Sequence, residues 1–287
     1  MRTNVSPIIA ALLFTGTCLS APLPTSAVSQ LHVISMHVQD HAAFDAVFLL
    51  LRDVLELPLV YGELSKPGNN ARRCYAGFSV GNAYLEPCGP YKSDVPFSPD
   101  RPARWHGLTF SPATTIVDAA EELGRKGIAH SEVMGRGETP RFVYVTNALL
   151  AGTRLAVSIW EIQNTNDSVN LNFLHSSLQK AGGGALGVKG LQEVSIQLPG
   201  KSSLAEWRNL LSTTNREGDV CLVGNGPALR LVAGTDMQIE SILLRVESLE
   251  KAKAALSQRR LLGRIAADHV ELDPAKTSGL RITLREK

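Results

Sequence analysis

The predicted order of strands and helices repeats along the chain, and this repetition constrains the fold more than any other feature. A strand at 31–38 is followed by an amphipathic helix at 42–57 and by three short strands that end at Pro87. The dipeptide Gly81-Asn82 between the last two of these strands is a hairpin signal. After a proline-rich segment the same order returns with a strand at 105–110. A βαβββ unit cannot bury its sheet faces alone, so these units are expected to pair.

The repetition continues in the C-terminal part with shorter units. Strands are expected at 190–198, 219–223, 228–232, 240–246, 269–272 and 280–284, and helices at 203–212 and 249–259. The fold class is therefore α+β, with paired βαβββ modules that form curved mixed sheets, arranged as two tandem domains. We place the first domain at 29–167, a linker at 168–187 and the second domain at 188–287.

The N-terminal segment has the pattern of an export signal. Arg2 precedes an apolar run at 7–14, which is too short to span a bilayer. Small residues follow, and Thr25-Ser26-Ala27 is a suitable cleavage site before Val28. We therefore predict a signal peptide at 1–27, a secreted or periplasmic protein, and no membrane association after cleavage.

The composition narrows the range of partners. The formal net charge is +2, 20% of the residues are charged, and no run of lysine or arginine exceeds two residues. A dedicated nucleic-acid binder carries a larger basic excess, so no nucleic-acid partner is expected. The remaining partner is a small-molecule substrate, and a homodimer is compatible with the sequence.

Two stretches of the first half resemble a known superfamily. These are 32–40, followed by the helix around Phe44, and 82–87. In this ordered set the chain is similar to the vicinal oxygen chelate superfamily, which includes glyoxalase I, bleomycin-resistance proteins and extradiol dioxygenases. The resemblance covers 30–165 well and 188–287 weakly. It implies the vicinal oxygen chelate fold of paired βαβββ modules.

The resemblance also implies a metal site with one ligand from each of four strands. The matching positions hold His32, Glu86, His106 and Glu161, and their order and spacing resemble those of metal-dependent glyoxalase I. Two imidazoles and two carboxylates suit one divalent ion, namely Zn²⁺, Ni²⁺, Mn²⁺ or Fe²⁺. The histidines at 37 and 41 are expected at the surface.

The second half departs from this pattern. Its matching positions hold Gln192, Val232, Ser241 and, for the fourth, Glu286. Since this set lacks histidine, we interpret 188–287 as a degenerate glyoxalase-like domain without metal ligands. Its role could be packing, dimerisation or covering the site of the first half.

Side chains beside the four ligands are candidates for substrate binding. Strand alternation places Ile34 and Met36 with His32, Tyr84 with Glu86, Leu108 and Phe110 with His106, and Ile159 with Glu161. We expect Tyr84, Phe110 and Ile159 to bind substrate in a mostly apolar cup. The alternative is that these side chains simply fill a closed barrel.

Two cysteines raise a further expectation. If Gly81 is the centre of a three-residue hairpin loop, Cys74 lies opposite Cys88 and a cross-strand disulfide can form. A register change of one residue removes this arrangement.

These features predict an exported, metal-dependent glyoxalase-like enzyme. It would be a lyase or isomerase acting on a small carbonyl or hydroxycarbonyl compound through a metal-stabilised enediolate, with Glu161 or Glu86 as the base. One alternative is an extradiol-type dioxygenase, with His32, His106 and one glutamate on non-haem iron. Another is a non-catalytic small-molecule-binding protein of the bleomycin-resistance type.

Overall fold

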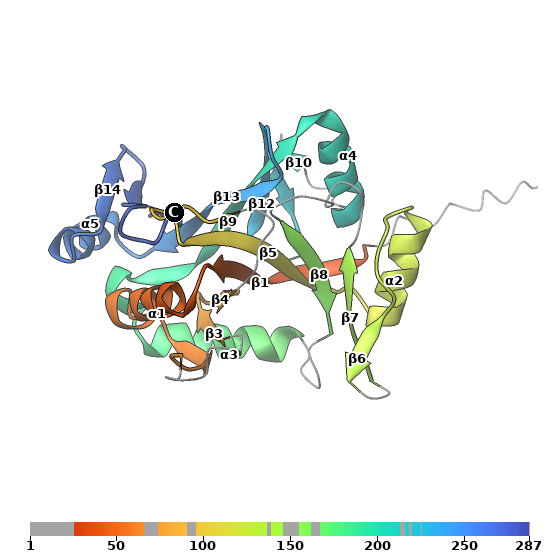
Figure 1. The fold of residues 1–287 in the computed structure, drawn as a ribbon, viewed down its shortest axis with the longest axis horizontal. Coiled ribbons are helices and arrows are strands. Elements are labelled where there is room, and N and C mark those ends of the chain that lie inside the picture. The colour runs from red at the N-terminus through yellow and green to blue at the C-terminus, as the bar shows by residue number, and fades with distance from the viewer. Residues whose placement is uncertain are drawn as a thin grey trace, which may run out of the picture.

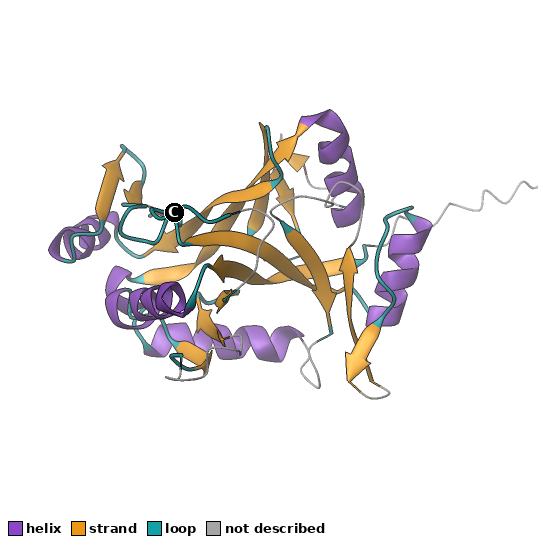
Figure 2. Ribbon diagram, viewed as in Figure 1, coloured by secondary structure: helices purple, strands orange, loops and turns teal. Residues whose placement is uncertain are grey.

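The fold consists of two eight-stranded mixed sheets with five α-helices among the residues that the structure describes (Figures 1 and 2). The structure is a computed structural model and describes residues 26–65, 74–90, 96–136, 139–145, 155–161, 167–212, 216–217, 220–224 and 226–286. The first sheet has the order β2-β3-β4-β1-β5-β8-β7-β6 and the second β10-β11-β12-β9-β13-β16-β15-β14. This confirms the predicted α+β class and the curved mixed sheets.

The first sheet is built from two βαβββ modules. The strands of the first module are β1 (Val28–Val38), β2 (Leu59–Gly62), β3 (Cys74–Ser79) and β4 (Tyr84–Gly89), and those of the second are β5 (Ala103–Pro112), β6 (Met134–Arg136), β7 (Thr139–Val145) and β8 (Ala156–Trp160). In the first module the leading strand is followed by helix α1 (His41–Leu49), which continues as a π-helical turn at Leu50–Val54. In the second module it is followed by α2 (Ile116–Arg125).

The second sheet repeats this design. Its strands are β9 (Val188–Pro199), β10 (Arg216–Glu217), β11 (Val220–Leu222) and β12 (Ala228–Gly234), then β13 (Gln238–Val246), β14 (Leu262–Ile265), β15 (Val270–Leu272) and β16 (Ile282–Arg285), with helices α4 (Gly200–Leu211) and α5 (Leu249–Gln258). The short strands β10 and β14 were not predicted, because neither shows the alternation of apolar residues that marked the others. The domain boundaries themselves stay a prediction.

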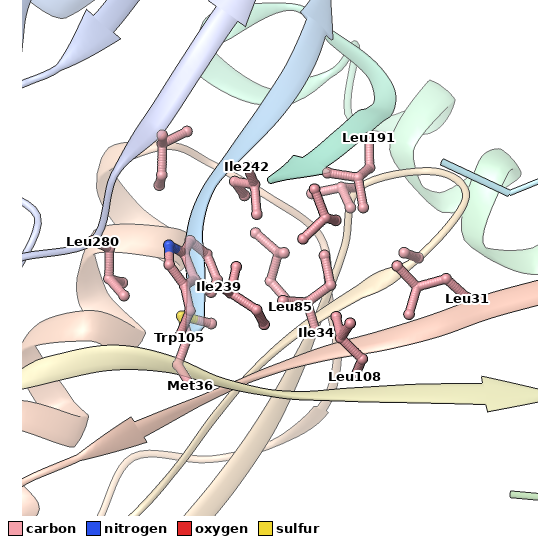
Figure 3. Close-up of a cluster of buried hydrophobic side chains, with 14 of the residues drawn as sticks. Leu31, Ile34, Met36, Leu85, Trp105, Leu108, Leu191, Ile239, Ile242 and Leu280 are labelled. Atoms are coloured by element: carbon pink, nitrogen blue, oxygen red, sulfur yellow. The ribbon is translucent and has the colours of Figure 1, made fainter. Parts of the chain in front are cut away.

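Each sheet has an inner face, turned towards the other sheet, and an outer face. On the inner face of the first sheet, Phe78 packs edge-on against Phe48 of α1, with ring centroids 5.2 Å apart. The central strands contribute inner-face side chains that meet those of β9 and β13 in one apolar core. Figure 3 shows this core with Ile34, Met36, Leu85, Trp105 and Leu108 against Leu191, Ile239 and Ile242. The core therefore lies between the sheets, and the outer faces are left for other functions.

The segment expected as a linker is largely helical. It forms α3 (Asp167–Lys180) and a 3₁₀ turn at Gly184–Leu186. Leu174 and Leu178 of α3 are buried, and the Ser79 hydroxyl donates a hydrogen bond of 2.8 Å to the Leu174 carbonyl. The many serine and asparagine residues of this segment hid its apolar face. The connection between the halves is therefore packed against the first sheet.

The β3–β4 hairpin also joins the two halves. The Asn82 side chain donates to the Leu191 carbonyl at 2.9 Å and accepts from the Leu191 N–H at 2.8 Å. The Asn82 amide thus satisfies both the N–H and the carbonyl of Leu191 in β9.

The predicted signal peptide lies almost entirely outside the described residues. Of its last two residues, Ala27 is 1% exposed, and its carbonyl accepts a hydrogen bond from Ala113 N–H at 3.1 Å. Among the residues described, no helix has both the length and the apolar character needed to cross a bilayer.

Candidate functional site

Two β-bulges determine which face of the first sheet carries the histidines. In the β1–β5 ladder, Leu31 pairs with Phe110 and Val33 with Thr109, so His32 is an extra residue on β1. Ser35 pairs with Gly107 and Met36 with Trp105, so His106 is the extra residue on β5. Such bulges re-aim side chains and are common next to active sites. His32 and His106 are therefore related by the pseudo-twofold symmetry between the two modules.

Both histidines lie on the outer face. The His32 ring is buried and meets the Tyr84 ring edge-on at 5.1 Å. The His106 ring stacks on His37, with centroids 3.3 Å apart and planes 18° apart. His37 is 8% exposed, so its expected surface position was wrong. The bulges thus bring three imidazoles to one face of the sheet.

Glu86 of β4 shares this outer face. It follows Tyr84 by two residues, and its parallel partner on β1 is Ser35, which directly precedes the second of these bulges in the ladder. The Tyr61 hydroxyl of β2 donates a short hydrogen bond to Glu86 Oε2. Burial raises the pKa of the Glu86 carboxyl, and the Tyr61 hydrogen bond opposes part of that rise. Burial and the neighbouring carboxylate raise the pKa of Tyr61 as well. Tyr61 was not predicted from the sequence as part of this site.

Glu161 lies elsewhere, on the inner side of the sheet. It follows β8 directly, and its Oε2 accepts a hydrogen bond of 3.2 Å from the N–H of Ile116, the first residue of α2. A carboxylate is stabilised at a helix N-terminus by unpaired N–H groups and the helix dipole. The structure therefore brings His32, Glu86 and His106 to one face and leaves Glu161 on the other.

The expected apolar neighbours of the ligands are also on the inner face. Phe110 and Ile159 are 0% exposed, and Phe110 pairs with both Leu31 and Ile159 in the ladders. Strand alternation predicted the wrong face for four residues, because each bulge adds a residue and reverses the face that follows. These residues are Ile34, Met36, Leu108 and Phe110. For Ile159, the alternation with Glu161 holds, but both lie inside. Tyr84 alone of the three substrate-binding candidates lies with the histidines.

Other side chains line the outer face instead. The Thr109 and Ser158 hydroxyls, from β5 and β8, are hydrogen-bonded at 3.0 Å. Beyond them Phe142 contacts both Tyr144 and Trp160, with centroid distances of 5.5 and 5.4 Å. Tyr144 and Trp160 are 40% and 44% exposed. The alternation of aromatic and aliphatic residues in 142–145 is the signal that would have pointed to this aromatic row.

Cys74 and Cys88 are not joined by a disulfide in the structure. The ladder pairs Cys74 with Gly89 and Tyr75 with Cys88, which puts the two cysteines on opposite faces of the sheet. Cys74 Sγ instead lies 3.6 Å from His41 Nδ1. The register differs by one residue from the one that the disulfide required.

The second sheet has bulges at the same places. Gln192 is the extra residue on β9 and Glu240 the extra residue on β13. Arg230 is the partner of Ser195, as Glu86 is of Ser35. The sequence had placed Val232 at the second position, two residues from Arg230, and Ser241 at the third, one residue from Glu240. Both were wrong because neither the strand offset nor the bulge on β13 can be read from the sequence. Gln192 and Glu286 were placed correctly.

The donor set of the first sheet fits a divalent metal in kind. Two imidazoles and a carboxylate on one face are ligands that Zn²⁺, Mn²⁺, Fe²⁺ and Ni²⁺ accept. In the arrangement of the described residues, no group of three His, Cys, Asp or Glu side chains converges closely enough to hold an ion. Binding would therefore require the side chains of this group to come closer together.

Comparison with known proteins gives the fold a name. No family model and no curated protein sequence matches the chain. Among solved structures, the substrate complex of homoprotocatechuate 2,3-dioxygenase from Brevibacterium fuscum matches with a TM-score of 0.57 at 14% identity, over 93% of this chain and 83% of that one. The chain has the fold of an extradiol dioxygenase.

Two further structures agree. The same dioxygenase from Arthrobacter globiformis matches with a TM-score of 0.56 at 14% identity, over 93% of this chain and 82% of that one. A hypothetical protein from Staphylococcus aureus matches with a TM-score of 0.55 at 11% identity, over 90% and 99%. Extradiol dioxygenases belong to the vicinal oxygen chelate superfamily that the sequence resembles. At these identities the likeness establishes the fold alone.

Proposed function

We propose that the outer face of the first sheet is a small-molecule site with one divalent metal ion held by His32, Glu86 and His106. One observation carries this proposal: two symmetry-related bulges turn both histidines to the face of Glu86. Without the bulges, alternation would not bring these side chains to one face. Three protein ligands leave coordination positions for a substrate with two neighbouring oxygens.

The metal would supply Lewis-acid chemistry by polarising a carbonyl or hydroxyl of the substrate. The chain supplies the remaining functions. Glu86 is the carboxylate of this face, and burial raises its pKa, which makes the carboxylate a stronger base. Thr109, Ser158 and Tyr84 offer hydroxyls for orientation. The aromatic row of Phe142, Tyr144 and Trp160 offers apolar surface for the body of the substrate.

The first candidate reaction is that of a lyase or isomerase, in which a proton leaves a carbon next to a carbonyl. Because Glu161 lies at the N-terminus of α2, Glu86 takes the role of base in this proposal. The loaded protein should exchange that proton of a hydroxycarbonyl compound with deuterium from heavy water, measured by NMR, and Glu86→Gln should not.

The second candidate is an extradiol-type dioxygenase. The placement of Glu161 favours it, since two histidines and one carboxylate form the ligand set expected for non-haem iron. The neighbour from Brevibacterium fuscum binds 3,4-dihydroxyphenylacetate. Oxygen uptake by the iron-loaded protein with this catechol would support this candidate, and proton exchange without oxygen uptake would support the first.

The metal itself is tested before either reaction. Protein purified without chelator or affinity nickel should hold close to one metal ion per chain after reloading, measured by mass spectrometry. The double variant His32→Ala/His106→Ala should hold none. Absence of metal in the wild type after reloading with Zn²⁺, Ni²⁺, Mn²⁺ and Fe²⁺ would contradict the proposal. It would leave the third interpretation, a non-catalytic binding protein.

We also propose that the chain is exported and that its signal is cleaved. The apolar run at 7–14 supports export. Because the carbonyl of the buried Ala27 is hydrogen-bonded to Ala113, the packing favours cleavage before Ser26 over cleavage after Ala27. N-terminal sequencing of protein from the medium or periplasm tests both points, and retention of Met1 in the cell would contradict export.

A further inference from the structure

A tyrosine from a strand outside the predicted ligand strands reaches the proposed metal ligand Glu86. Tyr61 lies on β2, and two strands separate β2 from β1 in the sheet order. Its ring extends across β3, and its hydroxyl donates to Glu86 Oε2 on β4. The hydrogen bond occupies one carboxylate oxygen and leaves Oε1 for another partner.

A glycine on β3 makes this reach sterically feasible. Gly77 pairs with Tyr61, and a Cβ atom built on Gly77 would lie 2.3 Å from Tyr61 Cε1 and 2.5 Å from Cζ. Gly77 is not among the residues with positive φ, so its backbone does not require glycine. The glycine is needed for space, because the tyrosine ring lies directly on it. Glycine in a strand commonly marks such a close approach.

The same ring continues towards His32. The centroids of Tyr61 and Tyr84 are 5.8 Å apart, and those of Tyr84 and His32 are 5.1 Å apart. Two of the three proposed ligands are thus contacted by one row of aromatic side chains. A shift of Tyr61 would affect both the hydrogen bond to Glu86 and the packing next to His32.

The second half lacks this combination at the same register positions. The β10–β11 ladder pairs Glu217 with Val220, as β2–β3 pairs Tyr61 with Gly77. Val220 in turn pairs with Arg230, the residue that takes the place of Glu86. The tyrosine, the glycine and the carboxylate therefore occur together only in the half that carries the histidines, although both halves have the same strand order.

We infer that Tyr61 is a positioning residue, which holds the Glu86 carboxylate through Oε2 and leaves its other oxygen for the metal. This inference rests on the proposed metal site. It assigns Gly77 a second role in the same device, because a side chain at Gly77 would displace the ring. Outer hydrogen-bond partners of metal ligands fix ligand orientation, and their loss commonly weakens metal binding about 10–100-fold.

Cobalt titration of the full chain tests the inference. Co²⁺ binding is followed by the visible absorption of the ion, which reports the ligand geometry, and Zn²⁺ affinity is measured by competition. Tyr61→Phe removes only the hydroxyl, and Gly77→Ala should displace the ring without removing any hydrogen-bonding group. Both variants should weaken binding about 10–100-fold and change the cobalt spectrum. Thermal unfolding of the metal-free proteins tests whether each variant is folded. If Gly77→Ala is not folded, the result for Tyr61→Phe alone decides.

Tyr75→Phe is the matched control. The ring of Tyr75 also lies near that of Tyr61, with centroids 6.3 Å apart. Tyr75 is 59% exposed, and no metal role is assigned to it. It should bind Co²⁺ with the wild-type spectrum and affinity. If the wild type binds Co²⁺ and Tyr61→Phe binds it equally well with the same spectrum, the inference is wrong and the metal site stands. If the wild type binds no Co²⁺ or Zn²⁺, the metal site and the inference both fall.

Discussion

The two halves of the molecule share a backbone and differ at the positions where chemistry is expected. Each half has two βαβββ modules, and each central ladder carries three bulges at equivalent places, two of which concern the proposed ligand positions. In the first half the bulged residues at these two places are His32 and His106, and in the second they are Gln192 and Glu240. The bulges are therefore a property of the fold. The side chains that they present are imidazoles in the first half, and an amide and a carboxylate in the second.

The position of Glu86 shows the difference most clearly. Its counterpart, Arg230, forms a two-pronged ion pair with Glu193, at 2.7 and 2.8 Å. A cation at this position opposes a divalent metal ion by charge repulsion. The second half thus uses ion pairing on its outer face where the first half places a carboxylate beside histidines.

The position of Glu161 is the one at which the halves agree. Glu286 occupies the equivalent place after β16, and its Oε2 accepts a hydrogen bond of 2.9 Å from Leu249 N–H, the first residue of α5. Glu161 does the same for Ile116 of α2 at 3.2 Å. Because the second half keeps this glutamate without histidines at the positions of His32 and His106, the shared contact explains Glu161 without a metal.

The largest expected effect tests the shared core. Phe110 and Leu244 are equivalent inner-face residues, 0% and 1% exposed. Phe110→Ala should lower the free energy of unfolding by about 3–5 kcal/mol, and Leu244→Ala by about 2–5 kcal/mol, since each leaves a cavity. Urea unfolding of the two variants measures this. If Phe110→Ala lowered the free energy of unfolding by less than about 1 kcal/mol, Phe110 would not be a core residue. The substrate-binding role that strand alternation had suggested would then be favoured.

A smaller effect tests the shared helix contact. Glu161→Ala and Glu286→Ala should each lower the free energy of unfolding by about 1 kcal/mol, the usual cost of losing a side-chain acceptor at a helix N-terminus. Neither should change metal affinity. Urea unfolding and metal titration of both variants provide the comparison. A tenfold loss of metal affinity in Glu161→Ala alone would show that Glu161 is a ligand after all.

The ion pair of the second half should contribute less. The Arg230 side chain is 46% exposed, and exposed pairs contribute about 0.2–1 kcal/mol. Arg230→Ala should therefore change the free energy of unfolding by no more than this and leave metal content unchanged. If Arg230→Ala bound a second metal ion, the positive charge of Arg230 would be the only feature that keeps metal out of the second half. The other residues of that half would then be able to bind metal.

The last expected effect is on the pH dependence of the free energy of unfolding. Because burial places the folded-state pKa of Glu86 above its ordinary value, the folded protein binds the proton more tightly than the unfolded chain. The stability of the metal-free wild type relative to Glu86→Gln should be highest below the ordinary pKa of glutamate. It should fall as the pH rises through the raised pKa. Parallel pH profiles of the unfolding free energy for the two proteins would contradict this assignment.

Most of the fold could be predicted from the sequence, because the modules repeat and their strands are marked by apolar periodicity. The choice of His32, Glu86 and His106 as candidate ligands came from the resemblance. The faces could not be predicted, since a bulge is a single inserted residue that leaves no sequence signal and reverses alternation. Phe110 was placed on the wrong face for this reason. Tyr61 was missed because its partner lies two strands away in the sheet.

An anomalous diffraction map of a crystal loaded with Co²⁺ tests the central claim most directly. We expect one metal peak on the outer face of the first sheet, bound by His32, Glu86 and His106. No peak is expected at Gln192, Arg230 or Glu240. A peak bound by Glu161, or cobalt on the second sheet but not the first, would contradict the account.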